Sequence, residues 1–168
     1  MDADWRELEA IKRLKYKYMR CIDRKLWEEL ADVFVPEATA SYSSGKYAFR
    51  GRDAILDFLR TSMGSPRFLS SHTVHHPEIE FTSPTTARAF WALEDTVLML
   101  DHGMTLHGAA LYEDEYVKCP DGHWRIRHTG YSRTWEEMFP RSSVAGLKLT
   151  ASLWETSGQS KLDVGRAE

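Results

Sequence analysis

The sequence predicts an α+β fold in which helices from the N-terminal half pack on one face of a curved antiparallel sheet. Two observations lead to this prediction. Apolar residues recur at helical spacing from Trp5 to Leu30, and long extended segments joined by turns fill most of the chain from Pro77 to Trp135. Helices followed by a run of consecutive strands are typical of α+β proteins. With 168 residues, the chain has the usual size of one domain with its own hydrophobic core.

Three helices are predicted before the long strands. The first carries an apolar stripe whose members lie three and four positions apart: Trp5, Leu8, Ile11, Leu14, Tyr18 and Ile22. Asp23 follows this stripe and is expected to cap a second, shorter helix that carries Leu26 and Leu30. Pro36 is expected to end this helical region. The third helix is predicted over Gly51–Met63.

Extended segments lie on both sides of the third helix. A hairpin is expected where Thr39–Ser43 and Tyr47–Arg50 flank the turn sequence Ser44-Gly45-Lys46. After the third helix, strands joined by turns rich in Gly, Pro and Asp are predicted over Pro77–Thr82, Thr86–Leu100, Met104–Lys118 and His123–Trp135. Residues 1–155 are expected to form the domain, and the polar residues 156–168 a frayed C-terminal tail.

Composition and charge exclude several functional classes. The 22 Lys and Arg residues against 25 Asp and Glu residues give a formal net charge of −3, without the basic excess of a nucleic-acid-binding protein. No apolar run is long enough to span a membrane, and no signal peptide is expected from the acidic and mixed N-terminal residues. Cys21 and Cys119 lie far apart in no metal-ligand spacing, so a reduced, cytoplasmic protein is expected.

The strand Thr86–Leu100 places a carboxylate among apolar side chains. Strand side chains alternate between two faces, and Asp95 shares its face with Ala89, Trp91 and Leu93. A carboxylate there is costly unless it is paired or hydrogen-bonded, and perturbed carboxylates in such settings are a signature of functional sites. Two structural alternatives stay open: a β-bulge could turn Asp95 outward, or a buried arginine could pair with it.

Tyr18 and a cluster of histidines complete the polar candidates. Tyr18 lies on the apolar stripe of the first helix, so its hydroxyl needs a partner, either a backbone carbonyl or a group in a site. His72, His75 and His76 come just before the strand expected at Pro77. A metal site is not expected, because the chain has neither a His-Glu-x-x-His motif nor a cysteine pair. A histidine and an aspartate can instead form a dyad in which the aspartate fixes the tautomer of a general base.

Short motifs distributed along the chain carry a family resemblance. They are Lys17-Tyr18-Met19-Arg20-Cys21-Ile22-Asp23, Ser41-Tyr42-Ser43-Ser44-Gly45-Lys46, His76-Pro77-Glu78-Ile79, Trp91-Ala92-Leu93-Glu94-Asp95, Gly122-His123-Trp124 and Thr129-Gly130-Tyr131-Ser132-Arg133. Through them the sequence resembles the SnoaL-like branch of the nuclear-transport-factor-2-like superfamily, and within it the bile-acid 7α-dehydratases. The resemblance covers about four-fifths of the chain and implies a cone-shaped barrel with a deep apolar pocket, no cofactor and a homotrimer.

The resemblance also implies a set of site residues. The catalytic residues of those dehydratases correspond here to Tyr18, Asp23, His72 and Asp95. His75 or His76 could take the place of His72, because a short gap would shift the match. An arginine of the last strand corresponds to Arg133. Strand alternation puts Arg133 on a polar face, so it reaches the pocket only if Gly130 forms a bulge; a salt bridge at the surface or at an interface is the alternative.

The function predicted from these residues is a cofactor-independent lyase that removes water from a hydrophobic, steroid-like or polycyclic hydroxy-carbonyl compound. His72 would take the acidic proton, and Asp23 would orient the imidazole ring. Tyr18 and Asp95 would donate hydrogen bonds to the enolate or to the departing hydroxyl. The substrate-binding residues are expected to be Tyr42, Trp91, Leu93 and Arg133. The alternatives are a ketosteroid-type isomerase and a non-catalytic protein similar to the small subunits of aromatic-ring dioxygenases.

The outer face of the sheet predicts self-association. Phe90, Ala92 and Leu98 lie on the strand face opposite Asp95 and would be exposed in a monomer, and apolar patches of this kind mark contact surfaces. We therefore expect a closed homotrimer, in agreement with the family resemblance. Light scattering at micromolar protein concentration tests this expectation, and the mass of a single subunit would contradict it.

Overall fold

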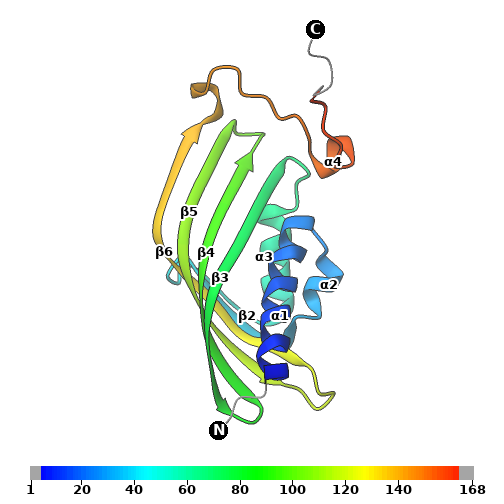
Figure 1. Ribbon diagram of the computed structural model, residues 1–168, viewed down its shortest axis with the longest axis vertical. Helices are drawn as coiled ribbons and strands as arrows, with labels where there is room; N and C mark the ends of the chain where they lie inside the picture. The colour runs from blue at the N-terminus through cyan, green and yellow to red at the C-terminus, as the bar shows by residue number, and fades with distance from the viewer. Residues whose placement is uncertain (1–4, 163–168) are drawn as a thin grey trace.

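A curved sheet of six strands holds helices against its concave side in the computed structural model, which describes residues 5–162 (Figure 1). The elements in chain order are α1 (Trp5–Arg24), α2 (Trp27–Ala31), β1 (Phe34–Tyr42), β2 (Tyr47–Arg50), α3 (Arg52–Met63), β3 (Phe68–Ser83), β4 (Thr86–Met99), β5 (Met104–Lys118), β6 (Trp124–Pro140), a short 3₁₀ helix (Arg141–Ser143) and α4 (Leu153–Thr156). The predicted α+β class, with helices in the N-terminal half, is confirmed. Within the described range, no helix is long and apolar enough to cross a membrane.

The strands follow the order β2-β1-β6-β5-β4-β3. All neighbouring strands are antiparallel except β1 and β6, which run parallel and make the sheet mixed. β2 and β3 form the two edges, so the sheet curves without closing on itself. In these two details it differs from the wholly antiparallel barrel that was expected. The parallel pairing is possible because β2, α3 and β3 to β5 lie between β1 and β6 in the chain. This long connection lets β1 lie beside β6, on the side away from β5, and run in the same direction.

Two strands begin earlier than the sequence predicted. β1 begins at Phe34, so Pro36 lies within a strand instead of ending the helical region, and the register with β6 shifts between Phe34 and Thr39. A strand accommodates proline at such an irregularity, where the missing N–H is not needed for the ladder. β3 begins at Phe68, which puts the cluster of three histidines inside a strand. The start of β3 is decided by its pairing with β4, which begins at Phe68, and not by the polarity of the residues around the histidines.

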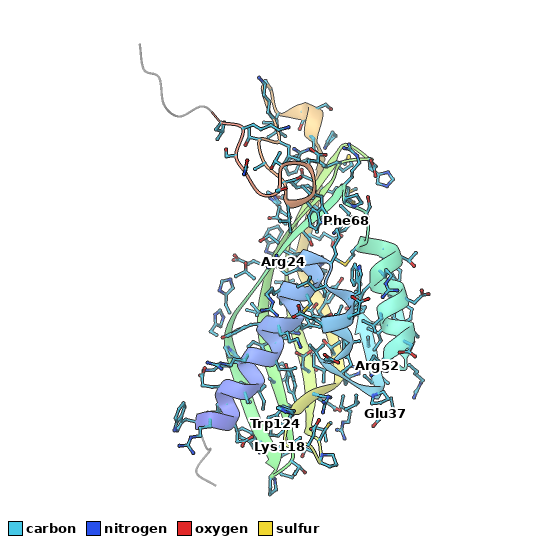
Figure 2. All side chains as sticks on the ribbon, turned by 90° about the vertical axis from the view of Figure 1, so that its right-hand side faces the viewer. Arg24, Glu37, Arg52, Phe68, Lys118 and Trp124 are labelled. Atoms are coloured by element: carbon cyan, nitrogen blue, oxygen red, sulfur yellow. The ribbon has the colours of Figure 1, made fainter. Side chains whose placement is uncertain are left out.

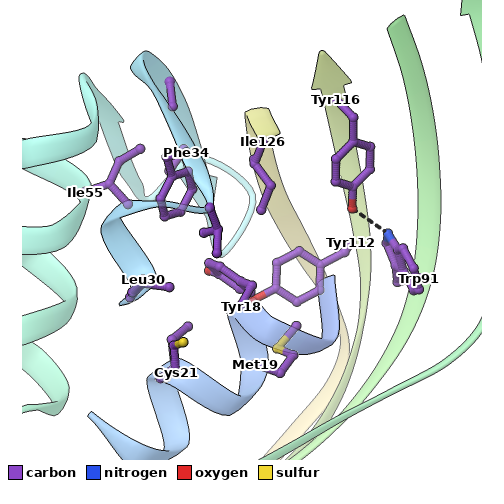
Figure 3. Close-up of a cluster of buried hydrophobic side chains, with 14 of the residues drawn as sticks. Tyr18, Met19, Cys21, Leu30, Phe34, Ile55, Trp91, Tyr112, Tyr116 and Ile126 are labelled. Atoms are coloured by element: carbon purple, nitrogen blue, oxygen red, sulfur yellow. Dashed lines mark hydrogen bonds between the residues drawn. The ribbon is translucent and has the colours of Figure 1, made fainter. Parts of the chain in front are cut away.

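The core fills the space between the helices and the concave face of the sheet (Figure 3). Ile11, Tyr18 and Ile22 of the predicted stripe on α1 are buried there, whereas Trp5 at its start is 67% exposed. Burying a large apolar side chain contributes about 1.5–3 kcal/mol. The stripe therefore fixes the position of α1 over the sheet, and with it the position of every polar residue that α1 carries.

Bulges in β6 decide which of its side chains face the helices. The register between β5 and β6 shifts twice. The shift nearer the start of β6 leaves Arg127 without a partner residue on β5. Ile126 faces the core before this bulge, and Tyr131 and Arg133 face inward after it. A one-residue bulge exchanges the two faces of a strand. Arg133 therefore reaches the inner face through a bulge at Arg127, not through the one expected at Gly130.

The segment after β6 crosses one end of the sheet toward the C-terminal end of α1 (Figure 1). In Figure 2, α1 rises from the end near Trp124 toward Phe68, and the C-terminal segment lies beyond Phe68. There α4 contacts its own domain, because the Trp154 ring lies 4.5 Å from Nζ of Lys25. Of the tail that was predicted to be frayed, residues 163–168 lie outside the described range.

Candidate active site

A cavity of about 440 Å³ opens between the concave face of the sheet and helices α1 and α3. Its volume lies in the range of small-molecule sites, and its wall combines aliphatic and aromatic side chains with polar and charged ones. The apolar lining includes Ile22, Phe58, Leu59, Leu93, Val97 and Leu106. The polar lining includes Tyr18, Tyr42, His72, Asp95, Arg133 and Glu136.

His72 and Asp23 form a dyad at the wall of this cavity. Nδ1 of His72 lies 2.6 Å from Oδ1 of Asp23, and the backbone N–H of His72 donates to Oδ2 at 2.9 Å. Ser70 donates its hydroxyl to Oδ1 at 2.8 Å. Ser70 and His72 of β3 thus contact both carboxylate oxygens of Asp23 on α1. An aspartate oxygen this close to Nδ1 favours the tautomer with the proton on Nδ1, which leaves Nε2 to accept a proton.

The expectation that Asp23 caps the second helix is wrong. α2 begins after Leu26, an apolar residue, and Asp23 lies in the last turn of α1. Lys25, with φ of 57°, turns the chain between the two helices, and its Nζ donates to the carbonyl oxygens of Met63 and Phe68 at 2.8 Å each. Because Lys25 fixes this turn, the Asp23 side chain can face β3 instead.

Asp95 projects from the inner face of β4, as strand alternation predicted, and pairs with Arg133 of β6. Nη1 and Nη2 of Arg133 lie 2.5 and 2.9 Å from the two carboxylate oxygens, and its Nε lies 2.9 Å from Oε2 of Glu136. Of the alternatives that the sequence left open, the arginine partner is the observed one. Both oxygens of this carboxylate accept hydrogen bonds from the guanidinium group. Asp95 is therefore placed as an acceptor, not as the hydrogen-bond donor that was expected.

Two phenolic hydroxyls meet inside the cavity. Tyr18 is fully buried, and its hydroxyl oxygen lies 3.0 Å from that of Tyr42 rather than on a backbone carbonyl. Burial raises the pKa of Tyr18 well above its ordinary value, and burial likewise raises the pKa of Tyr42. Both groups keep their protons at neutral pH and can donate hydrogen bonds.

Trp91 lies away from the cavity, unlike the other residues predicted to bind substrate. Its ring is fully buried, and its Nε1 donates to the hydroxyl of Tyr116 at 3.0 Å (Figure 3). It shares the inner face of β4 with Leu93, but core side chains cover it further along the strand. The prediction that Trp91 lines the pocket is therefore corrected, whereas Tyr42, Leu93 and Arg133 do line it.

The strand β3 separates the three clustered histidines. His72 lines the cavity, whereas Nε2 of His75 lies 3.8 Å from Glu94, an exposed residue of the outer face. His76, with φ of 26°, lies where the register with β4 is interrupted. Within residues 5–162, no group of three or more His, Cys, Asp or Glu side chains could hold a metal ion.

Gly108 is a site residue that sequence reasoning missed. A Cβ atom on this residue of β5 would lie 2.6 Å from Nη1 of Arg133 and 3.1 Å from Oδ1 of Asp95. The missing side chain therefore makes room for the ion pair on the inner face. A glycine inside a predicted strand is a signal of close approach by another group, and Met104–Lys118 contained that signal.

A family model covers most of the chain. Residues 4–130 match the model described as a SnoaL-like domain. The chain belongs to the SnoaL-like domain family. The resemblance drawn from the short motifs is thereby confirmed at the level of this family.

Solved structures share the fold of this SnoaL-like domain at low sequence identity. A putative scytalone dehydratase from Novosphingobium aromaticivorans matches with a TM-score of 0.72 and 24% identity, over 96% of this chain and 95% of that chain. The hexachlorocyclohexane dehydrochlorinase LinA-type3 from Novosphingobium barchaimii matches with 0.73 and 19%, over 88% and 97%. ActVI-ORFA from Streptomyces coelicolor matches with 0.65 and 16%, over 76% and 96%. At these identities the structures establish a common fold, so the reaction has to be inferred from the site.

Replacing Gly108 by alanine should disturb the Asp95–Arg133 pair in this SnoaL-like domain. The added methyl group would lie 2.6 Å from Nη1 of Arg133, so the guanidinium or the strand must move. Overpacking of this kind costs about 1–3 kcal/mol. Urea unfolding of Gly108→Ala should show a loss of stability of that size.

The matched control introduces Gly108→Ala into a protein that already carries Asp95→Ala and Arg133→Ala. There the ion pair no longer occupies the space, and the same methyl group should cost much less. The difference between the two backgrounds gives the coupling energy. Equal losses of stability would show that the glycine is not required by the ion pair.

Proposed function

We propose that this SnoaL-like domain is a cofactor-independent lyase that eliminates water from a hydrophobic hydroxy-carbonyl compound. The observation that carries the proposal is a histidine held by Asp23 at the wall of an apolar cavity that also contains paired phenolic hydroxyls. Two fold relatives are named as a dehydratase and a dehydrochlorinase, and these names support an elimination. The resemblance of the short motifs to those of bile-acid 7α-dehydratases supports a steroid-like or polycyclic substrate.

The first proposed step is removal of a proton made acidic by the substrate's carbonyl group. His72 donates Nδ1–H to Asp23, so Nε2 takes the proton and the ring becomes an imidazolium. The Asp23 carboxylate stabilises this positive charge, while Ser70 keeps the carboxylate in place. The electron pair of the broken C–H bond moves into the conjugated system, and the carbonyl becomes an enolate.

The hydroxyls of Tyr18 and Tyr42 are the proposed donors to the enolate oxygen. Burial raises the pKa of both groups, so they stay in the donating form when negative charge develops nearby. Donors that are fixed before the reaction stabilise an oxyanion more strongly in an apolar cavity than in water, because nothing needs to reorient.

The second proposed step is expulsion, by the enolate, of the hydroxyl group on the carbon next to the one that lost its proton. A carbon–carbon double bond forms, the C–O bond breaks, and the leaving oxygen takes the proton from the His72 imidazolium to become water. His72 returns to its neutral form without an external acid. Arg133, which contacts Asp95 and Glu136, is the proposed partner of an oxygen of the substrate or of the leaving group, through its remaining N–H groups.

A 7α-hydroxy-4-en-3-one steroid is the substrate that tests this proposal. Loss of water from it creates an extended dienone, which a growing ultraviolet absorbance band reveals. Mass spectrometry should show the loss of one water. A 5-en-3-one steroid that is isomerised without loss of water would favour a ketosteroid-type isomerase, and binding of both steroids without turnover would overturn the lyase proposal.

His72→Ala should lower kcat by about 10²–10⁴-fold, because the general base is lost. The fold should persist, since His72 lies at a cavity wall and not in the core, and circular dichroism checks this. His75→Ala is the matched control, because that side chain lies beside Glu94 on the outer face. Near-full activity of His72→Ala on a verified substrate would remove this residue from the mechanism.

Asp23→Asn should lower activity by up to about 10⁴-fold, since an amide neither stabilises the imidazolium nor fixes the same tautomer. One of the three hydrogen bonds from Ser70 and His72 also loses its acceptor, which costs about 1–3 kcal/mol of stability. Melting temperature and turnover should be measured on the same protein. Asp53→Asn, at a side chain that is 91% exposed, should change neither quantity. An active Asp23→Asn enzyme would contradict the dyad.

A further inference from the structure

A second buried ion pair lies next to the cavity and has no role in the proposed reaction. Nζ of Lys15 on α1 lies 2.7 Å from Oδ2 of Asp114 on β5, and both side chains are 0% exposed. Moving two charges out of water is costly, and a buried pair of this kind seldom contributes net stability. A contribution to folding stability therefore does not account for this pair.

Asp114 is held rigidly by neutral donors. The hydroxyl of Tyr116 donates to Oδ2 and that of Thr129 donates to Oδ1, each at 2.7 Å. Tyr116 in turn accepts the indole N–H of Trp91. The carboxylate therefore has a fixed position, and it fixes the position of the ammonium group that pairs with it.

The Lys15 ammonium contacts the aromatic rings that form one wall of the cavity. Nζ lies 3.4 Å from the ring centroid of Tyr112 and 4.8 Å from that of Tyr18. Both tyrosines line the cavity, and their rings stand nearly perpendicular, at 83° and 6.4 Å. A cation in contact with a ring is attracted by its π electrons and withdraws electron density from it. The charge thus acts on Tyr18, whose hydroxyl meets that of Tyr42.

We propose that Lys15 is a positioning residue of the oxyanion site: held by Asp114, its ammonium group fixes the rings of Tyr18 and Tyr112 and strengthens the Tyr18 hydroxyl as a hydrogen-bond donor. Lys15 acts through Tyr18 and does not touch the substrate. The inference rests on the proposed function, because that function assigns to Tyr18 and Tyr42 the binding of an enolate oxygen. It explains why a costly buried pair lies beside the rings of Tyr18 and Tyr112.

Binding of 2-naphthol tests the inference without any turnover. Its oxygen mimics an enolate oxygen, and donors in the cavity favour the bound naphtholate over the bound naphthol. The absorbance spectrum at fixed pH gives the ratio of the two forms. Lys15→Met combined with Asp114→Asn removes both charges together, so no unpaired ion is left behind. We expect this double variant to lower the ratio roughly tenfold.

Lys12→Met is the matched control on the same helix. Lys12 pairs with Glu9 at the surface and lies away from the rings, so its variant should keep the wild-type ratio. In a Tyr18→Phe background the Lys15 and Asp114 changes should have little further effect, because the donor they act on is gone. A folded double variant with the wild-type ratio would overturn the inference, and so would a wild-type protein that does not favour naphtholate.

A measurement on the wild-type protein covers the case in which the double variant does not fold. The ¹⁵N resonance of Lys15 Nζ should shift when 2-naphthol binds, and the shift should shrink in Tyr18→Phe. An unchanged resonance in the wild-type protein would overturn the inference. If 2-naphthol behaves as expected while no hydroxy-carbonyl compound is dehydrated, the lyase proposal fails and the role of Lys15 at an oxyanion site stands.

Discussion

Charged side chains that enter the concave side of this sheet must have partners, because an unpaired ion is costly among apolar groups. Within residues 5–162, this demand is met by Asp23 with His72, Asp95 with Arg133, and Lys15 with Asp114. Two of these pairs join α1 to a strand, and the third joins two strands that lie apart in the sheet. The ion pairs that compensate these charges therefore also hold α1 against the sheet beside the cavity.

Asp95 and Arg133 meet because the register between β5 and β6 is irregular. Side chains alternate along a strand, so a one-residue change would turn Arg133 to the outer face. The bulge at Arg127 supplies that change in β6, and Gly108 leaves the space on β5 that the guanidinium occupies. A short irregularity and a missing side chain thus decide whether Asp95 is a paired anion or an unpaired buried charge.

The cavity contains two groups of residues to which the proposed reaction assigns different tasks. In the proposed reaction, His72, fixed by Asp23, moves a proton, while the hydroxyls of Tyr18 and Tyr42 donate to an oxygen that becomes negatively charged. The apolar side chains around the cavity lower the local dielectric constant, which strengthens both interactions. Because these residues project from long helices and strands rather than from loops, their positions are fixed before a substrate enters.

Local spacing in the sequence determined the elements that depend on near neighbours. It predicted α1, α3, β4 and β5 close to their observed bounds, and it placed Asp95 on the inner face, because periodicity alone decides which side of a strand a residue faces. Family motifs pointed to His72 and Tyr18, which the structure brings to one cavity. The tertiary structure decided three other features: the parallel pairing of β1 with β6, the contact of Asp23 with β3 instead of a helix cap, and the burial of Trp91 in the core. Each of these depends on contacts between residues far apart in the chain, and no local pattern records which distant partner will satisfy a buried charge or fill a neighbouring space.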